Sequence, residues 1–535
     1  MNKYFKYILP LTALAFAMTS CQDETEPAGS YATTDQMARS SSATEALLSA
    51  IPASFNDVWD EDQHYSWGYG SLMHIRDLMT EDLAHVESNY DWYNQWEENY
   101  YIGREYRATQ FVWNYYYKMV LTANNLIGGL DPTVATTEQL GYLGVGYAFR
   151  AMMYLDMARM YEFLPNEAYP EGKNEEGNIV TNLTCPIVKA GMSEDSARVN
   201  PRASREVMKA FIENDLQEAE KYIVNLTDTR GKTLPDLAAV YGLEARLYMW
   251  VEDYAKAEEA AKKAIAASGL TPISQAQALD PSKGFNSTDY WMWGSTQTAE
   301  SPTVESSILN WTSWVSNETQ FGYASAGPMS MIGKSVYDRI SDNDWRKLYW
   351  KAPAVSALES QVPFLKANYK EDLVEYASIK FRPGSGNDGD GTIGAACSYP
   401  LMRVEEMFFI QAEAVAQQGR VDDAKTLLTD FMATRNPNYS CTLTEKDAVI
   451  EEIVFQKRVE LWGEGQTFFD IKRLNMSVTR GYEGSNFYEL CRFNTNGRPA
   501  WMNFVIVRTE ENNNSAVTGM NNPDPSDYYT PIKED

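Results

Sequence analysis

The chain of 535 residues has only 3 histidines and 5 cysteines, and its 46 Lys and Arg residues are outnumbered by 74 Asp and Glu residues. So few histidines nearly exclude a His-rich metal site. The formal net charge of −28 argues against nucleic-acid binding, because a phosphate backbone needs a basic face. The same charge disfavours a polyanionic glycan as a ligand.

The sequence motifs of common enzyme classes are also missing. The chain contains no HExxH, no paired CxxC, no GxSxG and no P-loop. Residues 387–391 (Asn-Asp-Gly-Asp-Gly) resemble the start of a calcium loop, but the glycine at position six and the closing glutamate are absent. Carboxylates are abundant, yet their spacing along the chain cannot establish the separation of a glycosidase pair. We therefore predict no catalysis, no cofactor and no metal.

Only the N-terminus carries a long apolar run. Lys3 and Lys6 precede apolar residues 8–18, a run of signal-peptide length that is shorter than the ~20 residues of a spanning helix. The run ends in Met-Thr-Ser-Cys21, which resembles a bacterial lipobox and implies cleavage before Cys21 and lipid on that cysteine. Residues 1–20 are therefore predicted to be a lipoprotein signal peptide. Residues 21–43, poor in apolar side chains, are predicted to be a flexible tether.

The remaining cysteines are far apart in the sequence, at Cys185, Cys397, Cys441 and Cys491. They allow three disulfide pairings, and the sequence favours none of them. Free thiols are an equally good interpretation.

Small residues recur at a spacing typical of paired helices. Ala245 and Ala257, like Ala412 and Ala424, are twelve positions apart, where two antiparallel helices would cross closely. This is the pattern of a tetratricopeptide helix–turn–helix unit of about 34 residues. A third unit is expected to pair a helix in residues 144–163 with one in residues 204–224, and a fourth to begin with a helix in residues 111–126. We predict a mainly α-helical fold with about four such units, in a single domain over residues 44–535.

Residues 271–399 differ from this pattern. Glycine, proline and asparagine interrupt them often, and they contain six of the fourteen tryptophans. Short helices and long loops are expected here. Irregular segments on a rigid framework are where binding surfaces usually lie.

Aromatic residues are plentiful, with 34 Tyr and 14 Trp. A sugar ring has a C–H face that stacks on Trp or Tyr and hydroxyl groups that hydrogen-bond to Asn, Asp or Arg. Two clusters have this mixture. The first comprises residues 64–69 and 90–96, and the second comprises residues 286–293 with Trp311 and Trp314. Plain burial is the alternative for each ring. The predicted glycan-binding residues are Trp67, Tyr90, Trp92, Trp96, Asp289, Tyr290, Trp291, Trp293, Trp311 and Trp314.

Three segments resemble the SusD/RagB family. Residues 399–414 resemble its "R-x-x-E … AEA" helix, residues 451–473 its "E-R-x-x-E-L-x-x-E-G-x-R-F-x-D-L-x-R" block, and residues 510–523 its closing Asn-Pro segment. Gln and Lys at 456–457 and Gln and Thr at 466–467 depart from the usual residues. We interpret the charged positions as structural ion pairs and helix-end contacts: Arg403, Glu405, Glu413, Arg458, Glu460, Glu464, Asp470 and Arg473.

The resemblance implies a lipid-anchored, surface-exposed protein of the outer membrane. Its implied partner is a SusC-like TonB-dependent transporter, to which it would deliver a captured glycan without cleaving it. A peptide ligand, as in RagB-like relatives, is one alternative. A surface glycoside hydrolase is another.

Overall fold

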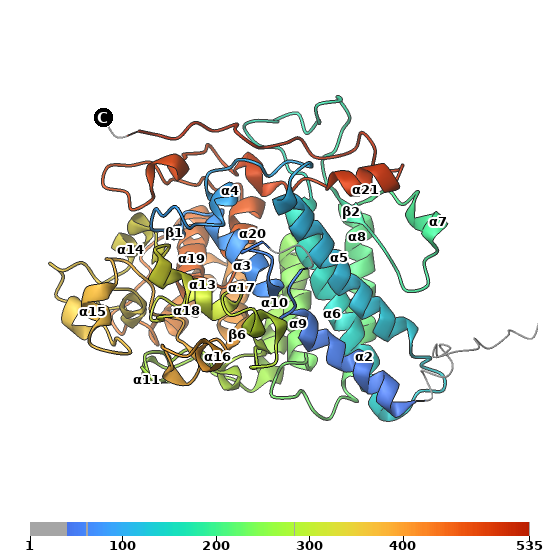
Figure 1. Ribbon diagram of the computed structural model, residues 1–535, viewed down its shortest axis with the longest axis horizontal. Coiled ribbons are helices and arrows are strands. Elements are labelled where there is room, and N and C mark those ends of the chain that lie inside the picture. Colours follow the sequence, from blue (N-terminus) through green and yellow to red (C-terminus); the bar gives the residue numbers. More distant parts are fainter. Residues whose placement is uncertain (1–39, 60–62, 283, 534–535) are drawn as a thin grey trace, which may run out of the picture.

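The computed structural model describes residues 40–59, 63–282 and 284–533 (Figure 1). The predicted signal peptide, the lipidation of Cys21 and nearly all of the predicted tether lie outside the described residues. The first described helix, α2 (Ser41–Ser54), has Ser40 as its N-cap. It therefore begins two residues before residue 43, where the tether was predicted to end.

Long helices form the scaffold and pack against one another in chain order (Figure 1). Helix α6 packs against α5 and α8, α9 against α10, α10 against α17, and α17 against both α18 and α19. The predicted tetratricopeptide-like helical fold is confirmed. These helices are α3 (Gly68–Leu78), α5 (Arg107–Gly128), α6 (Thr137–Tyr161), α8 (Arg205–Ile223), α9 (Leu237–Trp250), α10 (Tyr254–Ser268), α17 (Val404–Gln417), α18 (Val421–Met432) and α19 (Lys446–Glu460).

The α9–α10 pair shows how local sequence specifies a unit. The side chains of Asp236 and Asp253 cap the two N-termini by accepting from the amides of Ala239 and Lys256. Helix α10 ends at Gly269, whose positive φ of 60° suits glycine. Ala245 and Ala257 are fully buried, so the small side chains let the helix axes approach closely.

Strands are few and short. Three two-stranded antiparallel sheets pair β1 (Leu83–His85) with β5 (Ser330–Ile332), β2 (Leu183–Pro186) with β3 (Arg202–Ser204), and β4 (Trp293–Thr296) with β6 (Ser398–Met402). The segment 271–399 otherwise consists of loops and one-turn to two-turn helices, as its composition predicted. Its helices are α11 (Gln275–Ala278), η1 (Thr288–Tyr290), α12 (Pro302–Glu305), α13 (Trp311–Val315), η2 (Tyr323–Ala326), α14 (Lys334–Arg339), η3 (Trp345–Tyr349), η4 (Glu359–Gln361), α15 (Tyr369–Asp372), η5 (Gly384–Gly386) and α16 (Gly391–Gly394).

The remaining short helices lie in connections and near the C-terminus: α4 (Asn94–Glu97), α7 (Glu194–Ala197), α20 (Thr467–Arg473), η6 (Glu489–Cys491), η7 (Ala500–Met502) and α21 (Arg508–Asn513). Cys185, Cys397, Cys441 and Cys491 are all free thiols. Among the described helices, none is both long enough and apolar enough to cross a membrane.

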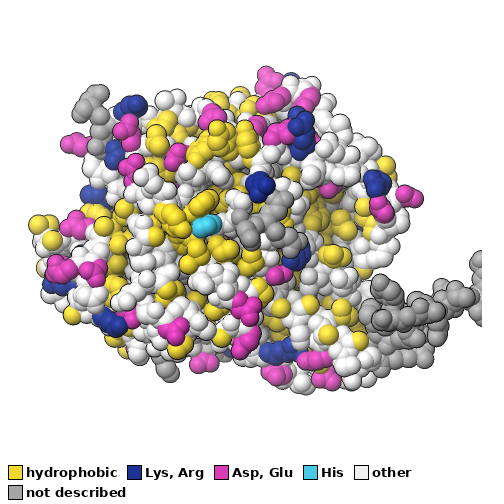
Figure 2. Space-filling model, viewed as in Figure 1, with side chains coloured by type: hydrophobic (Ala, Val, Ile, Leu, Met, Phe, Trp, Pro, Cys, Tyr) yellow, Lys and Arg dark blue, Asp and Glu magenta, His cyan; other side chains and the backbone are white. Residues whose placement is uncertain are grey.

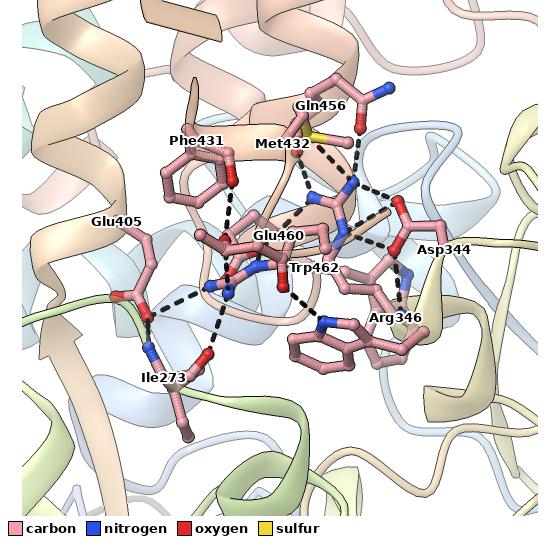
Figure 3. A network of polar contacts seen from close by, with 12 residues as sticks. Ile273, Asp344, Arg346, Glu405, Phe431, Met432, Gln456, Glu460 and Trp462 are labelled. Atoms are coloured by element: carbon pink, nitrogen blue, oxygen red, sulfur yellow. Dashed lines mark hydrogen bonds and ion pairs between the residues drawn. The ribbon is translucent and has the colours of Figure 1, made fainter. Parts of the chain in front are cut away.

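A buried ion-pair network joins the third of the scaffold nearest the C-terminus (Figure 3). The Glu460 carboxylate at the end of α19 is only 1% exposed. It contacts the guanidinium groups of Arg346 at 3.2 Å, Arg403 at 3.2 Å and Arg435 at 2.9 Å. These arginines come from η3, from the N-cap of α17 and from the turn after α18. One carboxylate therefore ties three elements together.

The other charged residues of the SusD-like segments extend this network. Glu405 and Glu464 both pair with Arg403, at 3.1 and 2.9 Å. Further pairs are Glu413–Arg473 at 2.5 Å, Asp470–Arg473 at 2.9 Å and Arg458–Glu81 at 2.7 Å. The two positions at 456–457 that depart from the family pattern also take part, since Lys457 pairs with Asp470 and Gln456 accepts from Arg346.

Candidate ligand-binding site

Six of the predicted glycan-binding residues are buried, and for them the prediction of an exposed platform is wrong. The irregular segment lies against the helices, so its large rings fill the interior. Trp311, for example, stacks on Tyr399 with ring centroids 4.9 Å apart. The Trp293 indole N–H donates to the Thr233 carbonyl at 3.1 Å. The buried residues are Trp67, Trp96, Trp291, Trp293, Trp311 and Trp314.

In the second predicted cluster, only Asp289 and Tyr290 among the predicted residues keep accessible surface. Asp289 is exposed and Tyr290 is half-buried against the core, both in η1. No ring contact joins Tyr290 to another aromatic residue in the part of the chain that the structure describes. The predicted rings that are exposed, Tyr90 and Trp92, both belong to the first cluster.

Tyr90 and Trp92 are 42% and 36% exposed and belong to a four-ring group that we call the aromatic patch: His64, Tyr90, Trp92 and Tyr323. Trp92 stacks on His64 with centroids 4.1 Å apart, and Tyr90 stacks on Tyr323 at 5.6 Å. The Tyr90 and Trp92 rings are 6.2 Å apart at an interplanar angle of 85°. The two exposed rings thus meet as a corner.

Buried aromatic rings support the patch from below. The Trp314 indole stacks on Tyr323 at 3.7 Å and donates its N–H to the His64 carbonyl at 3.2 Å. The Tyr93 ring meets Trp314 edge-on at 4.6 Å. The Tyr323 hydroxyl and His64 Nδ1 also hydrogen-bond to each other. The patch is therefore preorganised by the core beneath it.

The patch lies among other apolar groups on the molecular surface. His74 and His85 are buried, and the single histidine that Figure 2 shows on this face is surrounded by hydrophobic side chains. Burial lowers the pKa of His64, so its ring is neutral at pH 7 and stacks on Trp92 as an uncharged ring. The sequence placed His64 in the first cluster but gave no signal for Tyr323, which no local spacing connects to Trp92.

The loop that carries the exposed rings is held at both ends. The Val86 amide donates to the Met329 carbonyl at 3.0 Å, which continues the pairing of β1 with β5. The Asp91 carboxylate accepts from the Tyr93 amide at 2.8 Å and contacts His85 Nδ1 at 3.2 Å. Gly327 has a φ of 128°, and a Cβ there would lie 2.8 Å from the Ser88 hydroxyl. The absence of a side chain at Gly327 therefore lets this loop approach the segment before β5 closely.

A buried charged cluster lies at the base of this loop. His85 Nδ1 contacts Asp91 at 3.2 Å and Glu97 at 3.1 Å, and His85 Nε2 lies 3.1 Å from His74 Nε2. Donor atoms of His85, Asp91 and Glu97 all lie within 4.8 Å of one another, a spacing that a metal ion requires. The imidazole already contacts both carboxyl groups, so each of them has a partner within the protein.

The pKa values of the cluster follow from burial and charge. Burial alone would lower the pKa of His85, but Glu97 and Asp91 raise it to about 10. Burial, together with the nearby Asp91, raises the pKa of Glu97 to about 8. Burial and the charge on His85 lower the pKa of His74. At neutral pH, His85 is therefore cationic and His74 neutral, so His85 donates to His74.

We expect the stabilising effect of His85 to depend on pH. Because its folded-state pKa lies above the unfolded value of 6.5, the contribution is complete below about pH 6.5 and is lost as pH rises toward 10. Each pH unit removes at most about 1.4 kcal/mol. Urea unfolding of wild type and His85→Gln at pH 6.0 and 9.5 measures this, and the wild-type advantage should shrink at pH 9.5. An advantage that stays constant across this range would contradict the assignment.

Two family models match the chain. The model described as "SusD family" matches residues 366–535, and the model "Starch-binding associating with outer membrane" matches residues 33–249. The chain belongs to the SusD/RagB-like family. Among curated protein sequences, none matches it.

Solved structures share the fold of this SusD-like protein. A SusD-like carbohydrate-binding protein of Bacteroides vulgatus superposes with a TM-score of 0.66 at 21% identity, covering 89% of this chain and 96% of its own. A putative sugar-binding protein of the same species gives 0.65 at 19%, covering 91% and 98%. A SusD superfamily protein of Bacteroides thetaiotaomicron gives 0.65 at 17%, covering 92% and 100%.

The family segments of this SusD-like protein support the aromatic patch indirectly. Arg458 contacts the Asp82 carboxylate at 3.1 Å, and the Trp462 indole donates to the Asp82 carbonyl at 2.7 Å. Asp82 directly precedes β1, and the loop with Tyr90 and Trp92 follows that strand. The charged block therefore fixes the strand from which the loop with Tyr90 and Trp92 extends.

Proposed function

We propose that this protein captures a glycan on the aromatic patch and passes it, uncleaved, to a SusC-like TonB-dependent transporter of the outer membrane. The observation that carries the proposal is the corner of exposed Tyr90 and Trp92 rings on a buried aromatic base. A lipid on Cys21 would hold the protein at the membrane surface. The names of the family model and of the structural relatives, which mention starch, carbohydrate and sugar, support this ligand class.

The patch suits capture and release. Two exposed rings offer stacking area for the C–H faces of sugars, and the fixed loop reduces the entropy lost on binding. So small a contact gives modest affinity, and a fast dissociation rate is what delivery to a second protein requires.

Catalysis is disfavoured at the patch. Asp91 lies between Tyr90 and Trp92 in the sequence, but its side chain is only 5% exposed and its carboxylate contacts His85 and the Tyr93 amide. General acid or base catalysis needs a carboxyl group within hydrogen-bond reach of the ligand. Asp91 is engaged elsewhere, so we assign it to positioning the loop.

Affinity electrophoresis and calorimetry with a panel of neutral polysaccharides test the proposal. We expect retardation by at least one glycan and no new reducing ends when the mixture is chromatographed after incubation. New reducing ends would show that the protein is a hydrolase. Binding of peptides without binding of any glycan would replace the glycan with a peptide ligand.

Replacing Trp92 by alanine should weaken glycan binding about tenfold or more, because the stacking surface is lost. Trp92 is partly exposed, so the melting temperature should change little. Calorimetric titration with the best glycan of the panel measures the affinity. Tyr528→Ala removes another exposed ring (48% exposed) and should leave the affinity unchanged. Unchanged affinity in Trp92→Ala would remove the patch as the site.

A further inference from the structure

A pocket separate from the aromatic patch lies between α5, the segment around α7, and α21. Its volume is about 470 Å³, within the range of small-molecule sites. Figure 1 shows α7 and α21 at one side of the molecule and α13 near its middle. The next helix after α13, η2, contains Tyr323 of the aromatic patch. None of the residues of the aromatic patch lines the pocket.

One wall of the pocket is aromatic. Trp113 and Tyr117 lie one turn apart on α5, with ring centroids 4.8 Å apart. Trp113 meets Tyr161 edge-on at 4.9 Å, and the Tyr117 hydroxyl donates to the Pro186 carbonyl at 2.7 Å. Both rings are therefore fixed before any ligand arrives, and because Trp113 is only 3% exposed, Tyr117 is the ring that can meet a ligand.

The facing wall is polar and equally fixed. The buried Asn514 side chain donates to the Glu510 carboxylate at 2.8 Å and to the Asn200 carbonyl at 2.6 Å. Its own oxygen accepts from the Asn200 amide at 3.0 Å. These bonds set the position of Glu510 at the pocket.

Several polar groups of the lining keep unused hydrogen-bonding capacity. Within the described residues, the Asn114 carboxamide has no hydrogen-bond partner, and Glu510 uses only one carboxylate oxygen. The side-chain nitrogens of Asn200 and Asn513 donate to the carbonyls of Ile187 and Thr509. Their side-chain oxygens accept no hydrogen bond from the described residues. The pocket therefore presents a mixture of donors and acceptors.

This mixture selects the class of ligand. Arg198, the one cation of the lining, is already paired with Glu194, so an anion would meet two carboxylates and no free positive charge. A cation would leave the Asn114 amide donors unused. Hydroxyl groups both donate and accept, and they would be satisfied by the amides and by Glu510 while a C–H face packs on the aromatic wall.

We propose that this pocket is a second site that binds one neutral sugar unit, separate from the aromatic patch. The proposal goes beyond the proposed function and does not depend on it. It assigns Tyr117 to packing against the sugar, with the buried Trp113 supporting that ring from behind, and Asn114 and Glu510 to hydroxyl recognition.

Saturation-transfer NMR with a mixture of glucose, galactose, mannose, xylose and N-acetylglucosamine tests the pocket in Trp92→Ala protein, where the aromatic patch is weakened. We expect at least one sugar to bind. Adding Asn114→Ala and Glu510→Gln should weaken that binding at least tenfold without changing the melting temperature, because Asn114 makes no described side-chain hydrogen bond and Gln preserves the acceptor for Asn514. Asn512→Ala, an exposed change on α21 outside the lining, should have no effect.

Two results would overturn the proposal: no sugar of the mixture binds the Trp92→Ala protein, or binding is unchanged by the Asn114 and Glu510 substitutions. Inorganic phosphate or ethanolamine binding in place of the sugars would overturn the ligand class. Failure of the proposed function would look different. If the aromatic patch is not the glycan site, Trp92→Ala protein keeps the wild-type affinity for the polysaccharide, whatever the pocket binds.

Discussion

Replacing Glu460 with glutamine should lower the free energy of unfolding by about 3–5 kcal/mol, because three buried guanidinium groups lose a carboxylate that they share. The guanidinium groups of Arg346, Arg403 and Arg435 all contact the Glu460 carboxylate. Figure 3 shows Glu460 and Arg346 within this network. Burial would raise the pKa of Glu460, but these arginines lower it well below its ordinary value. Urea or thermal unfolding at pH 7 measures the loss.

A matched control lies on the same helix. Glu451 of α19 pairs with Arg339 at 3.3 Å, and both side chains are exposed, so Glu451→Gln should cost less than about 1 kcal/mol. The Glu460 contribution is present above the unfolded pKa of 4.5 and is lost as pH falls, so the two variants should become more alike in acid. An equal, small effect of both substitutions at pH 7 would contradict a structural role for the network.

The helical scaffold could be predicted because its signals are local. The alanines of the α9–α10 and α17–α18 pairs lie at a spacing that two crossing helices require, and they are buried at those crossings. Asp236 and Asp253 cap the helices from within the same segments. A pattern that operates within 34 residues is readable without tertiary information.

The charged network was predictable in kind but not in its partners. Asp470 and Arg473 lie three positions apart and pair as helix spacing suggests. Most other pairs join residues far apart in the chain, such as Arg403 with Glu460 and Arg458 with Glu81. Their geometry depends on how α17, α19 and the β1 region pack, which no local spacing specifies.

The exposure of the aromatic rings could not be predicted for the same reason. Trp92 and Trp96 have the spacing of one helix face, but α4 begins only at Asn94. Trp92 therefore precedes the helix and stays 36% exposed, while Trp96 is 2% exposed. Composition marks a Trp-rich segment as a candidate surface, whereas burial is decided by the elements that happen to cover it.

Replacing Trp314 by alanine should reduce both stability and glycan binding, unlike Trp92→Ala. Removal of a buried Trp side chain typically costs about 3–5 kcal/mol, and Trp314 is fully buried among aromatic rings. It also stacks on Tyr323 and holds the His64 carbonyl, so two rings of the aromatic patch lose their support. Chemical unfolding at 25 °C and calorimetric titration of the still-folded fraction measure the two effects.

Trp314→Phe separates the two roles of this side chain. Phenylalanine keeps a ring for stacking on Tyr323 but removes the N–H that donates to His64, so stability should recover in part while the affinity stays below wild type. Trp293→Ala is the matched control, because its indole is equally buried but donates to Thr233, away from the patch. It should destabilise the protein by a similar amount and leave the affinity of folded protein unchanged. If both substitutions lower the affinity equally, the loss reflects general unfolding, and the buried base has no specific part in preorganising the site.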